Sequence, residues 1–188
     1  AYEKVRAEVQ QSRVLHADET PHRMLEGDDK KSWYLWGFSN EKASYVDIRN
    51  TRSGEVASDF LSNAACEFLV SDVYRGYGKA VRQANLIRHP EGRPLISHVF
   101  CNAHSRRKFK EAEVFGEEAR FFIDTYKDIY ALENGIRGRP PNEILRVRQD
   151  MIPLFEAMKE RAMEGLPSVS SKSAMGKAYS YFLENYDG

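Results

Sequence analysis

Residues 13–21, RVLHADETP, are typical of a strand that leads into a turn. Val14 and Leu15 are apolar and compatible with a strand, and Pro21 lacks the N–H group that further pairing would need. We therefore expect Asp18 to lie at a strand end. A single aspartate in such a place often only begins a turn or caps a helix, so this stretch by itself leaves both interpretations open.

A second apolar run with the same ending occupies residues 67–72, EFLVSD. It is bounded by polar residues and ends at Asp72. Two aspartates at the ends of two strands can share one metal ion, so the pair is more informative than either residue alone. Asp18 and Asp72 are the candidate catalytic and metal-binding residues of this chain.

Composition favours a folded, cytoplasmic protein. The chain has 188 residues, which suits one domain or one domain with an insertion, and its 41% hydrophobic content is enough to form a core. No apolar run approaches the roughly 20 residues that span a bilayer, and no signal peptide opens the chain. Two cysteines imply no disulfide framework. The chain begins and ends beside helical patterns, so we expect a piece of a longer protein without a membrane partner.

Positive charge gathers in one stretch although the formal net charge is zero. Between residues 75 and 110 there are nine Lys or Arg against one acid, Glu91. Such a stretch suits contacts to nucleic-acid phosphates, and the predominance of Arg strengthens this interpretation because guanidinium binds phosphate in a bidentate manner. The alternative is an ordinary solvated face. The basic residues are Arg75, Lys79, Arg82, Arg88, Arg93, Arg106, Arg107, Lys108 and Lys110.

The first half of the chain predicts an α/β fold with a mixed five-stranded sheet flanked by helices. Three strands come first, followed by helix, strand, helix and strand, and the first three should form an antiparallel meander. This is also the order of the ribonuclease H-like fold, in which strands one and four carry neighbouring acidic residues. Strands are expected over residues 13–21, 31–38, 44–49, 67–72 and 95–101, and helices over residues 1–11, 53–61 and 78–84.

The second half predicts helices alone. Apolar residues recur at helical spacing, Pro153 should kink or interrupt one helix, and a last helix should begin near Ser173. We therefore expect three parts: the first part of a ribonuclease H-like core over residues 1–104, an all-helical insertion or extension over residues 105–172, and the start of a further helix over residues 173–188.

Several blocks of the sequence resemble the central domain of bacterial insertion-sequence transposases of the sixty-six family. The pair formed by Asp-x-Tyr-x-x-Tyr and Cys-x-Ala-His-x-Arg-Arg-Lys-Phe is the most specific, whereas Val73 and Asn102 depart from the family pattern. The blocks are His16-Ala17-Asp18-Glu19-Thr20, Trp33-Tyr34-Leu35-Trp36, Arg52-Ser53, Ser71-Asp72-Val73-Tyr74-Arg75-Gly76-Tyr77, and residues His98 to Phe109.

The resemblance implies a DDE transposase that cuts and rejoins DNA at insertion-sequence ends with two Mg²⁺ or Mn²⁺ ions. Asp18 and Asp72 would be its first two acids. The third acid of the family, a Glu in an Asp-Asn-Asn-x-x-Glu motif, is absent up to Gly188, so this piece alone is expected to be inactive. Self-association on DNA is compatible with this hypothesis. The expected DNA-binding residues are Arg75, Arg82, His104, Arg106, Arg107 and Lys108.

Two other interpretations stay open. The spacing of His98, Cys101 and His104 could hold zinc, but a structural zinc site usually needs four ligands and no Cys-x-x-Cys partner is present. The chain could also be a ribonuclease H-like DNA-binding module without chemistry. Metal binding by Asp18 and Asp72 distinguishes this module from the enzyme.

Overall fold

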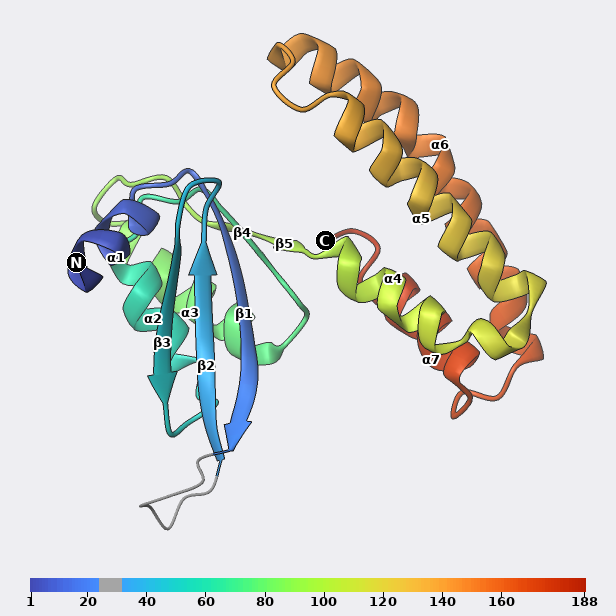
Figure 1. The fold of residues 1–188 in the computed structure, drawn as a ribbon, viewed down its shortest axis with the longest axis horizontal. Coiled ribbons are helices and arrows are strands. Elements are labelled where there is room, and N and C mark those ends of the chain that lie inside the picture. Colours follow the sequence, from blue (N-terminus) through green and yellow to red (C-terminus); the bar gives the residue numbers. More distant parts are fainter. Residues whose placement is uncertain (24–31) are drawn as a thin grey trace. The chain divides into compact units, whose positions relative to one another are not determined.

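The computed structural model describes residues 1–23 and 32–188 and consists of two compact units (Figure 1). The sheet unit comprises Ala1–Cys101 together with Gly188, and the helical unit comprises Asn102–Asp187. Lys31, the expected first residue of the second strand, lies outside the described residues. Each unit has a hydrophobic core of its own.

The sheet unit contains the mixed five-stranded sheet that the sequence predicts. The strands lie in the order β3-β2-β1-β4-β5. β1 pairs antiparallel with β2 and parallel with β4, so strands one and four of the chain are neighbours. The strands are β1 (Val14–Arg23), β2 (Ser32–Ser39), β3 (Ser44–Arg49), β4 (Phe68–Ser71) and β5 (Ser97–Phe100).

Three helices cover one face of this sheet: α1 (Tyr2–Gln10), α2 (Glu55–Ser62) and α3 (Arg75–Arg88). Side chains of a strand alternate between its two faces, so Leu15 and Ala17 of β1 are buried beneath the helices whereas His16 is exposed. The core is partly aromatic. Phe38 of β2 stacks on Phe60 of α2 with ring centroids 4.0 Å apart.

β1 is longer than expected, and this changes the place of Asp18. Pro21 does not end the pairing, because it lies opposite Tyr34 and the β1–β2 ladder runs on to Arg23. Described pairing of β1 with β4 stops at His16, and proline is tolerated where one edge of a strand has no neighbour. Asp18 therefore lies inside β1, at the point where β4 stops accompanying it, and not at the end of the strand.

The two helices after β3 also differ from the predicted ranges. α2 begins at Glu55 with Gly54 as its N-cap, although the Ser53 hydroxyl still accepts a bond from the Glu55 N–H. α3 is longer than residues 78–84. The N-termini of α2 and α3 approach closely, since a Cβ on Gly54 would lie 2.5 Å from the Gly76 carbonyl oxygen. Only glycine fits at this contact.

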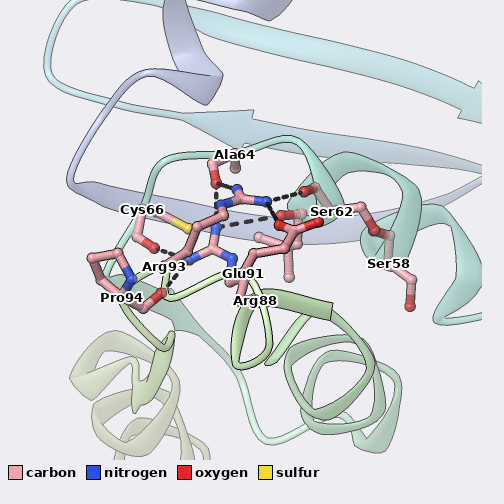
Figure 2. A network of polar contacts seen from close by, with 9 residues as sticks. Ser58, Ser62, Ala64, Cys66, Arg88, Glu91, Arg93 and Pro94 are labelled. Carbon is pink, nitrogen blue, oxygen red and sulfur yellow. Dashed lines mark hydrogen bonds and ion pairs between the residues drawn. The ribbon is translucent and has the colours of Figure 1, made fainter. Parts of the chain in front are cut away.

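A buried arginine joins the far ends of these helices. Arg88 is 1% exposed, and its guanidinium donates to backbone carbonyls of four residues (Figure 2). Arg93 lies beside it and donates to carbonyls at the end of α2. Burial lowers the pKa of Arg88. The carbonyls that accept from Arg88 belong to Leu61, Ala64, Cys66 and Pro94.

The helical unit is built from four helices, two of whose three connections contain a short 3₁₀ turn, and the range 105–172, all of it described, contains no strand. Its core is rich in aromatic rings, such as Phe109 stacked on Phe122 at 4.1 Å. Pro153 does not interrupt its helix, which runs without a break. The last helix begins next to Ser173 as predicted, and the Ser173 hydroxyl caps it by accepting from the Gly176 N–H. The helices are α4 (Asn102–Glu111), α5 (Glu117–Gly135), α6 (Pro141–Gly165) and α7 (Ala174–Glu184).

Candidate active site

The register of β1 against β4 places the two candidate aspartates opposite each other. The parallel ladder ends with His16 opposite Val70. Two residues further along each chain are Asp18 and Asp72. Residues opposite each other in a parallel pair share a face of the sheet, and a step of two residues keeps that face. The carboxylates are therefore expected on the same face, at the carboxyl end of β4.

This face is the one that α1, α2 and α3 leave uncovered. Asp18 is exposed and Asp72 is half-buried, whereas Leu15 and Leu69, which are opposite each other in the same ladder, are fully buried. Apolar side chains thus point toward the helices of the sheet unit, and the aspartates point away from that core. Such an arrangement leaves the carboxylates accessible to an ion or a substrate.

A backbone amide orients each carboxylate. Oδ1 of Asp18 accepts from the Glu19 N–H at 3.0 Å, and Oδ1 of Asp72 accepts from the Tyr74 N–H at 2.9 Å. Carboxylate oxygens are the ligands that Mg²⁺ prefers, so this donor set fits a divalent cation. Outside residues 24–31, no group of three His, Cys, Asp or Glu side chains is close enough to hold a metal ion. Asp18 and Asp72 therefore remain a candidate pair of carboxylates, without a third such ligand among the described residues.

Glu19 lies on the opposite face of β1 and serves a different purpose. Its side chain is only 1% exposed, and Oε1 accepts from Nε and Nη2 of Arg52 at 2.8 and 2.6 Å. A buried carboxylate is costly unless it is paired, and the Arg52 fork supplies the pair. Glu19 is directed into the sheet-unit core and away from the face that carries Asp18.

Tyr77 of α3 has a buried hydroxyl whose pKa responds to the charges of Glu19, Asp18 and Asp72. Burial raises the pKa of its hydroxyl far above the ordinary value, and the charges of Glu19, Asp18 and Asp72 raise it further. The ring also contacts Trp36 edge to face at 5.8 Å.

His98 of β5 contacts Ser71, the last residue of β4, which directly precedes Asp72. The Ser71 hydroxyl donates to the Asp72 carbonyl oxygen and lies 2.7 Å from His98 Nε2. The Ser71 hydroxyl thus links His98 of β5 to the backbone of Asp72. Burial lowers the pKa of His98, and the charge of Asp72 partly opposes this shift. Nε2 of His98 is thus engaged with Ser71.

The six expected DNA-binding residues lie in both units. Arg75 and Arg82 are exposed on α3 of the sheet unit, whereas the other four belong to α4 of the helical unit. Arg88, which was counted with the basic stretch, is buried and bound to carbonyl groups, so it is not available to phosphate. The four residues on α4 are His104, Arg106, Arg107 and Lys108.

Sequence reasoning named Arg52 and Tyr77 only as parts of family-like blocks and His98 only as a possible zinc ligand, and it did not identify the contacts that these residues make. Their partners are 33 residues away for Arg52 and 27 for His98, so local patterns do not connect them. One signal was available for Glu19: in a strand, the neighbour of an exposed Asp18 must face the core. A glutamate there requires a cationic partner, although the sequence does not say which one.

Comparison with known proteins identifies the family to which the sequence is similar. The chain matches the transposase IS66 family over residues 1–188. It is 25% identical over 211 aligned positions to the uncharacterized protein y4hP of Sinorhizobium fredii, covering 100% of this chain and 37% of that protein. It is 32% identical over 92 residues to the uncharacterized protein y4jD of the same organism, covering 47% of this chain and 18% of that protein.

The chain thus spans about a third of the first of these relatives and about a fifth of the second. No solved structure matches it. Among the described helices, none combines the length and the apolar character needed to cross a membrane. The match over all 188 residues identifies the chain as a member of the IS66 family of transposases.

Proposed function

We propose that this chain is the catalytic region of a DDE transposase, with Asp18 and Asp72 as its first two metal-binding acids. The observation that carries the proposal is their common register, two residues beyond the last pair of the parallel β1–β4 ladder. The adjacency of strands one and four also supports a ribonuclease H-like assignment for the sheet unit. The reaction would be cleavage and rejoining of DNA at the ends of an insertion sequence.

Each aspartate has one oxygen held by a backbone amide and another that can face a ligand. When bound, two Mg²⁺ or Mn²⁺ ions supply activation of water or of a DNA 3′-hydroxyl and stabilise the leaving oxygen. Glu19 is not proposed as a ligand, because its side chain is buried on the other face and paired with Arg52. Its role is to support the strand beneath Asp18.

We further propose that the third acid lies outside residues 1–188. Among the described residues no third carboxylate joins Asp18 and Asp72 at metal distance, and the relative y4hP is nearly three times as long as the region matched here. Two carboxylates alone make a weak site. Residues 1–188 should therefore bind Mn²⁺ loosely and cleave no DNA. A longer protein that includes the third acid should bind Mn²⁺ more tightly and cleave DNA.

DNA contacts are proposed for Arg75, Arg82, His104, Arg106, Arg107 and Lys108. The arginines and the lysine would neutralise phosphates, which gives affinity without sequence preference. Replacing both Arg106 and Arg107 with Ala should lower the slope of log affinity against log salt by about 0.9 for each phosphate that is no longer neutralised. A slope equal to that of the unmodified chain would remove these two residues from the DNA-binding set.

The decisive experiment measures DNA cleavage by a longer transposase that contains this chain. Asp18→Asn and Asp72→Asn should each abolish cleavage while DNA affinity is retained, because removal of a metal ligand leaves the basic side chains in place. Asp47→Asn is the matched control, since Asp47 lies in the same sheet and is paired with Arg49. It should leave cleavage unchanged. Normal cleavage by either of the first two variants would contradict the catalytic assignment. It would favour the interpretation of residues 1–188 as a DNA-binding module without chemistry.

A further inference from the structure

We propose that Arg52 is a positioning residue that holds Asp18 and Asp72 in their relative places. The inference rests on the proposed function, in which these two carboxylates share metal ions. Arg52 lies in the loop between β3 and α2 and belongs to neither acid-bearing segment. Arg52 nevertheless contacts both segments. In each segment it contacts the residue whose backbone amide donates to the aspartate, Glu19 beside Asp18 and Tyr74 near Asp72.

The need for such a connection follows from the topology. Among the described residues, the β1–β4 ladder pairs Val14–His16 with Phe68–Val70 and ends there. Beyond this point β1 continues beside β2, while the chain after β4 turns into α3. The aspartates lie just after the parting. Side chains must therefore fix the separation of the two segments where the carboxylates are.

The first contact is with the segment of Asp18. Nε and Nη2 of Arg52 both donate to Oε1 of Glu19, whose side chain is almost entirely buried. Holding Glu19 toward the core fixes the opposite orientation of its neighbour, Asp18. The Glu19 N–H also donates to Oδ1 of Asp18. The residue that Arg52 binds is thus the one that orients the first carboxylate.

The second contact is with the segment of Asp72. The guanidinium of Arg52 lies over the Tyr74 ring, 4.3 Å from its centroid, and the Tyr74 hydroxyl donates to the Arg52 carbonyl oxygen at 2.6 Å. Tyr74 in turn donates its N–H to Oδ1 of Asp72. Arg52 therefore contacts both residues whose backbone amides orient the candidate metal ligands.

The loop that carries Arg52 is itself anchored. The indole N–H of Trp36, a fully buried residue opposite Glu19 in β2, donates to the Thr51 carbonyl oxygen at 3.1 Å. The Thr51 hydroxyl accepts from the Ser53 N–H at 3.0 Å. A fixed loop can transmit position, and a mobile one could not. Outer residues that orient metal ligands typically change metal affinity about 10- to 100-fold when removed.

The test uses NMR of the ¹⁵N-labelled chain of residues 1–188, first without metal. In Arg52→Gln, the Glu19 and Tyr74 amide protons should exchange faster with solvent, because the side chains of both residues are no longer held by the guanidinium. Arg52→Lys should give an intermediate result, since lysine keeps the charge but not the planar fork. This pair keeps the test valid if the Gln variant folds poorly, and thermal unfolding of each variant checks this.

Arg161→Gln is the matched control. Arg161 also forms a two-point ion pair, with Glu118, and also lies over an aromatic ring, that of Phe121 at 4.8 Å. It belongs to the helical unit. This variant should leave the exchange of the Glu19 and Tyr74 amides unchanged. Equal exchange in the Arg52 and Arg161 variants would overturn the inference.

Titration with Mg²⁺ separates this inference from the proposed function. The affinity for Mg²⁺ should fall about 10-fold in Arg52→Gln. If Asp18→Asn abolishes the Mg²⁺ response and Arg52→Gln leaves the affinity unchanged, the positioning role is wrong and the metal site stands. If neither aspartate variant alters the response while both amides loosen in Arg52→Gln, the proposed metal site is wrong and the positioning of the aspartates by Arg52 is supported.

Discussion

The sheet unit buries charged side chains, and the helical unit keeps its charges at the surface. Glu19 and Arg88 of the sheet unit are 8% and 1% exposed, whereas the ion pair of Arg161 with Glu118 in the helical unit has side chains about half exposed. Burying charge costs free energy unless every group is paired. In the sheet unit, Glu19 is paired with Arg52 beside Asp18, and Arg88 binds carbonyl groups of the segments that precede β4 and β5.

The core of the helical unit has a simpler basis. Stacked and edge-to-face rings of Phe109, Phe122 and Tyr179 fill it, and Ser105 is a buried polar residue of this unit. Aromatic burial of this kind stabilises a fold without demanding one particular polar geometry. The difference indicates that substitutions of buried charge should act strongly in the sheet unit, while substitutions of surface charge in the helical unit should act weakly.

Removing Arg88 should have the largest effect on stability. Arg88→Met keeps much of the side-chain volume but leaves buried carbonyls without a donor, so we expect a loss of about 3 kcal/mol in the free energy of unfolding. Urea unfolding followed by tryptophan fluorescence measures it, because both tryptophans, Trp33 and Trp36, belong to the sheet unit. Arg93→Met is the control and should cost less, since Arg93 is about one-third exposed.

A loss in Arg88→Met no greater than that in Arg93→Met would contradict the role given to buried charge. The carbonyls around Arg88 would then be satisfied by water, and the contrast between the two units would rest on packing alone.

Two glycines should respond in opposite directions. In Gly54→Ala the new Cβ would lie 2.5 Å from the Gly76 carbonyl oxygen, so α2 and α3 must move apart at a cost of about 1 to 3 kcal/mol. In Gly135→Ala, at the end of α5, the Cβ would meet no atom within 4 Å. That substitution should stabilise the helical unit by about 0.5 to 1 kcal/mol. Thermal unfolding followed by circular dichroism compares them, and destabilisation by both variants would refute the distinction.

The smallest effect is expected for Glu118. Its hydrogen bond with Arg161 lowers the pKa of this carboxyl below the ordinary value. A lowered pKa in the folded state stabilises the protein above the unfolded pKa of about 4.3, and this stabilisation is lost as the pH falls through the folded pKa. Because the pair is half exposed, the contribution should stay below about 1 kcal/mol.

Unfolding measured between pH 7 and pH 3 tests this expectation. Arg161→Gln should be slightly less stable than the unmodified chain at pH 7, and the difference should shrink toward pH 3. A difference that grows on acidification would mean that Glu118 is not the group that titrates.

Much of the fold followed from local patterns, and the parts that did not were set by distant contacts. Apolar runs predicted all five strands, and the beginning of the last helix near Ser173 was confirmed. The extent of β1 could not be predicted, because proline is tolerated at a strand edge without a neighbour, and among the described residues Pro21 pairs only with β2. Arg88 was counted with the phosphate-binding stretch for a similar reason, since sequence does not show that carbonyls from separate segments converge on it.

The candidate site likewise has residues that the sequence could identify and one whose role depends on distant contacts. Asp18 and Asp72 could be chosen because each follows an apolar strand pattern and fits a family motif. Arg52 could not be assigned a role, because its importance depends on contacts to Glu19 and Tyr74 that only the tertiary structure brings together.

The most direct test of the central claim is anomalous diffraction from a crystal of residues 1–188 soaked in Mn²⁺. We expect an anomalous peak between the carboxylates of Asp18 and Asp72, about 2.1 Å from an oxygen of each, and disappearance of that peak in Asp72→Asn. A Mn²⁺ peak on other side chains, with none shared by these two aspartates, would contradict the assignment of the site.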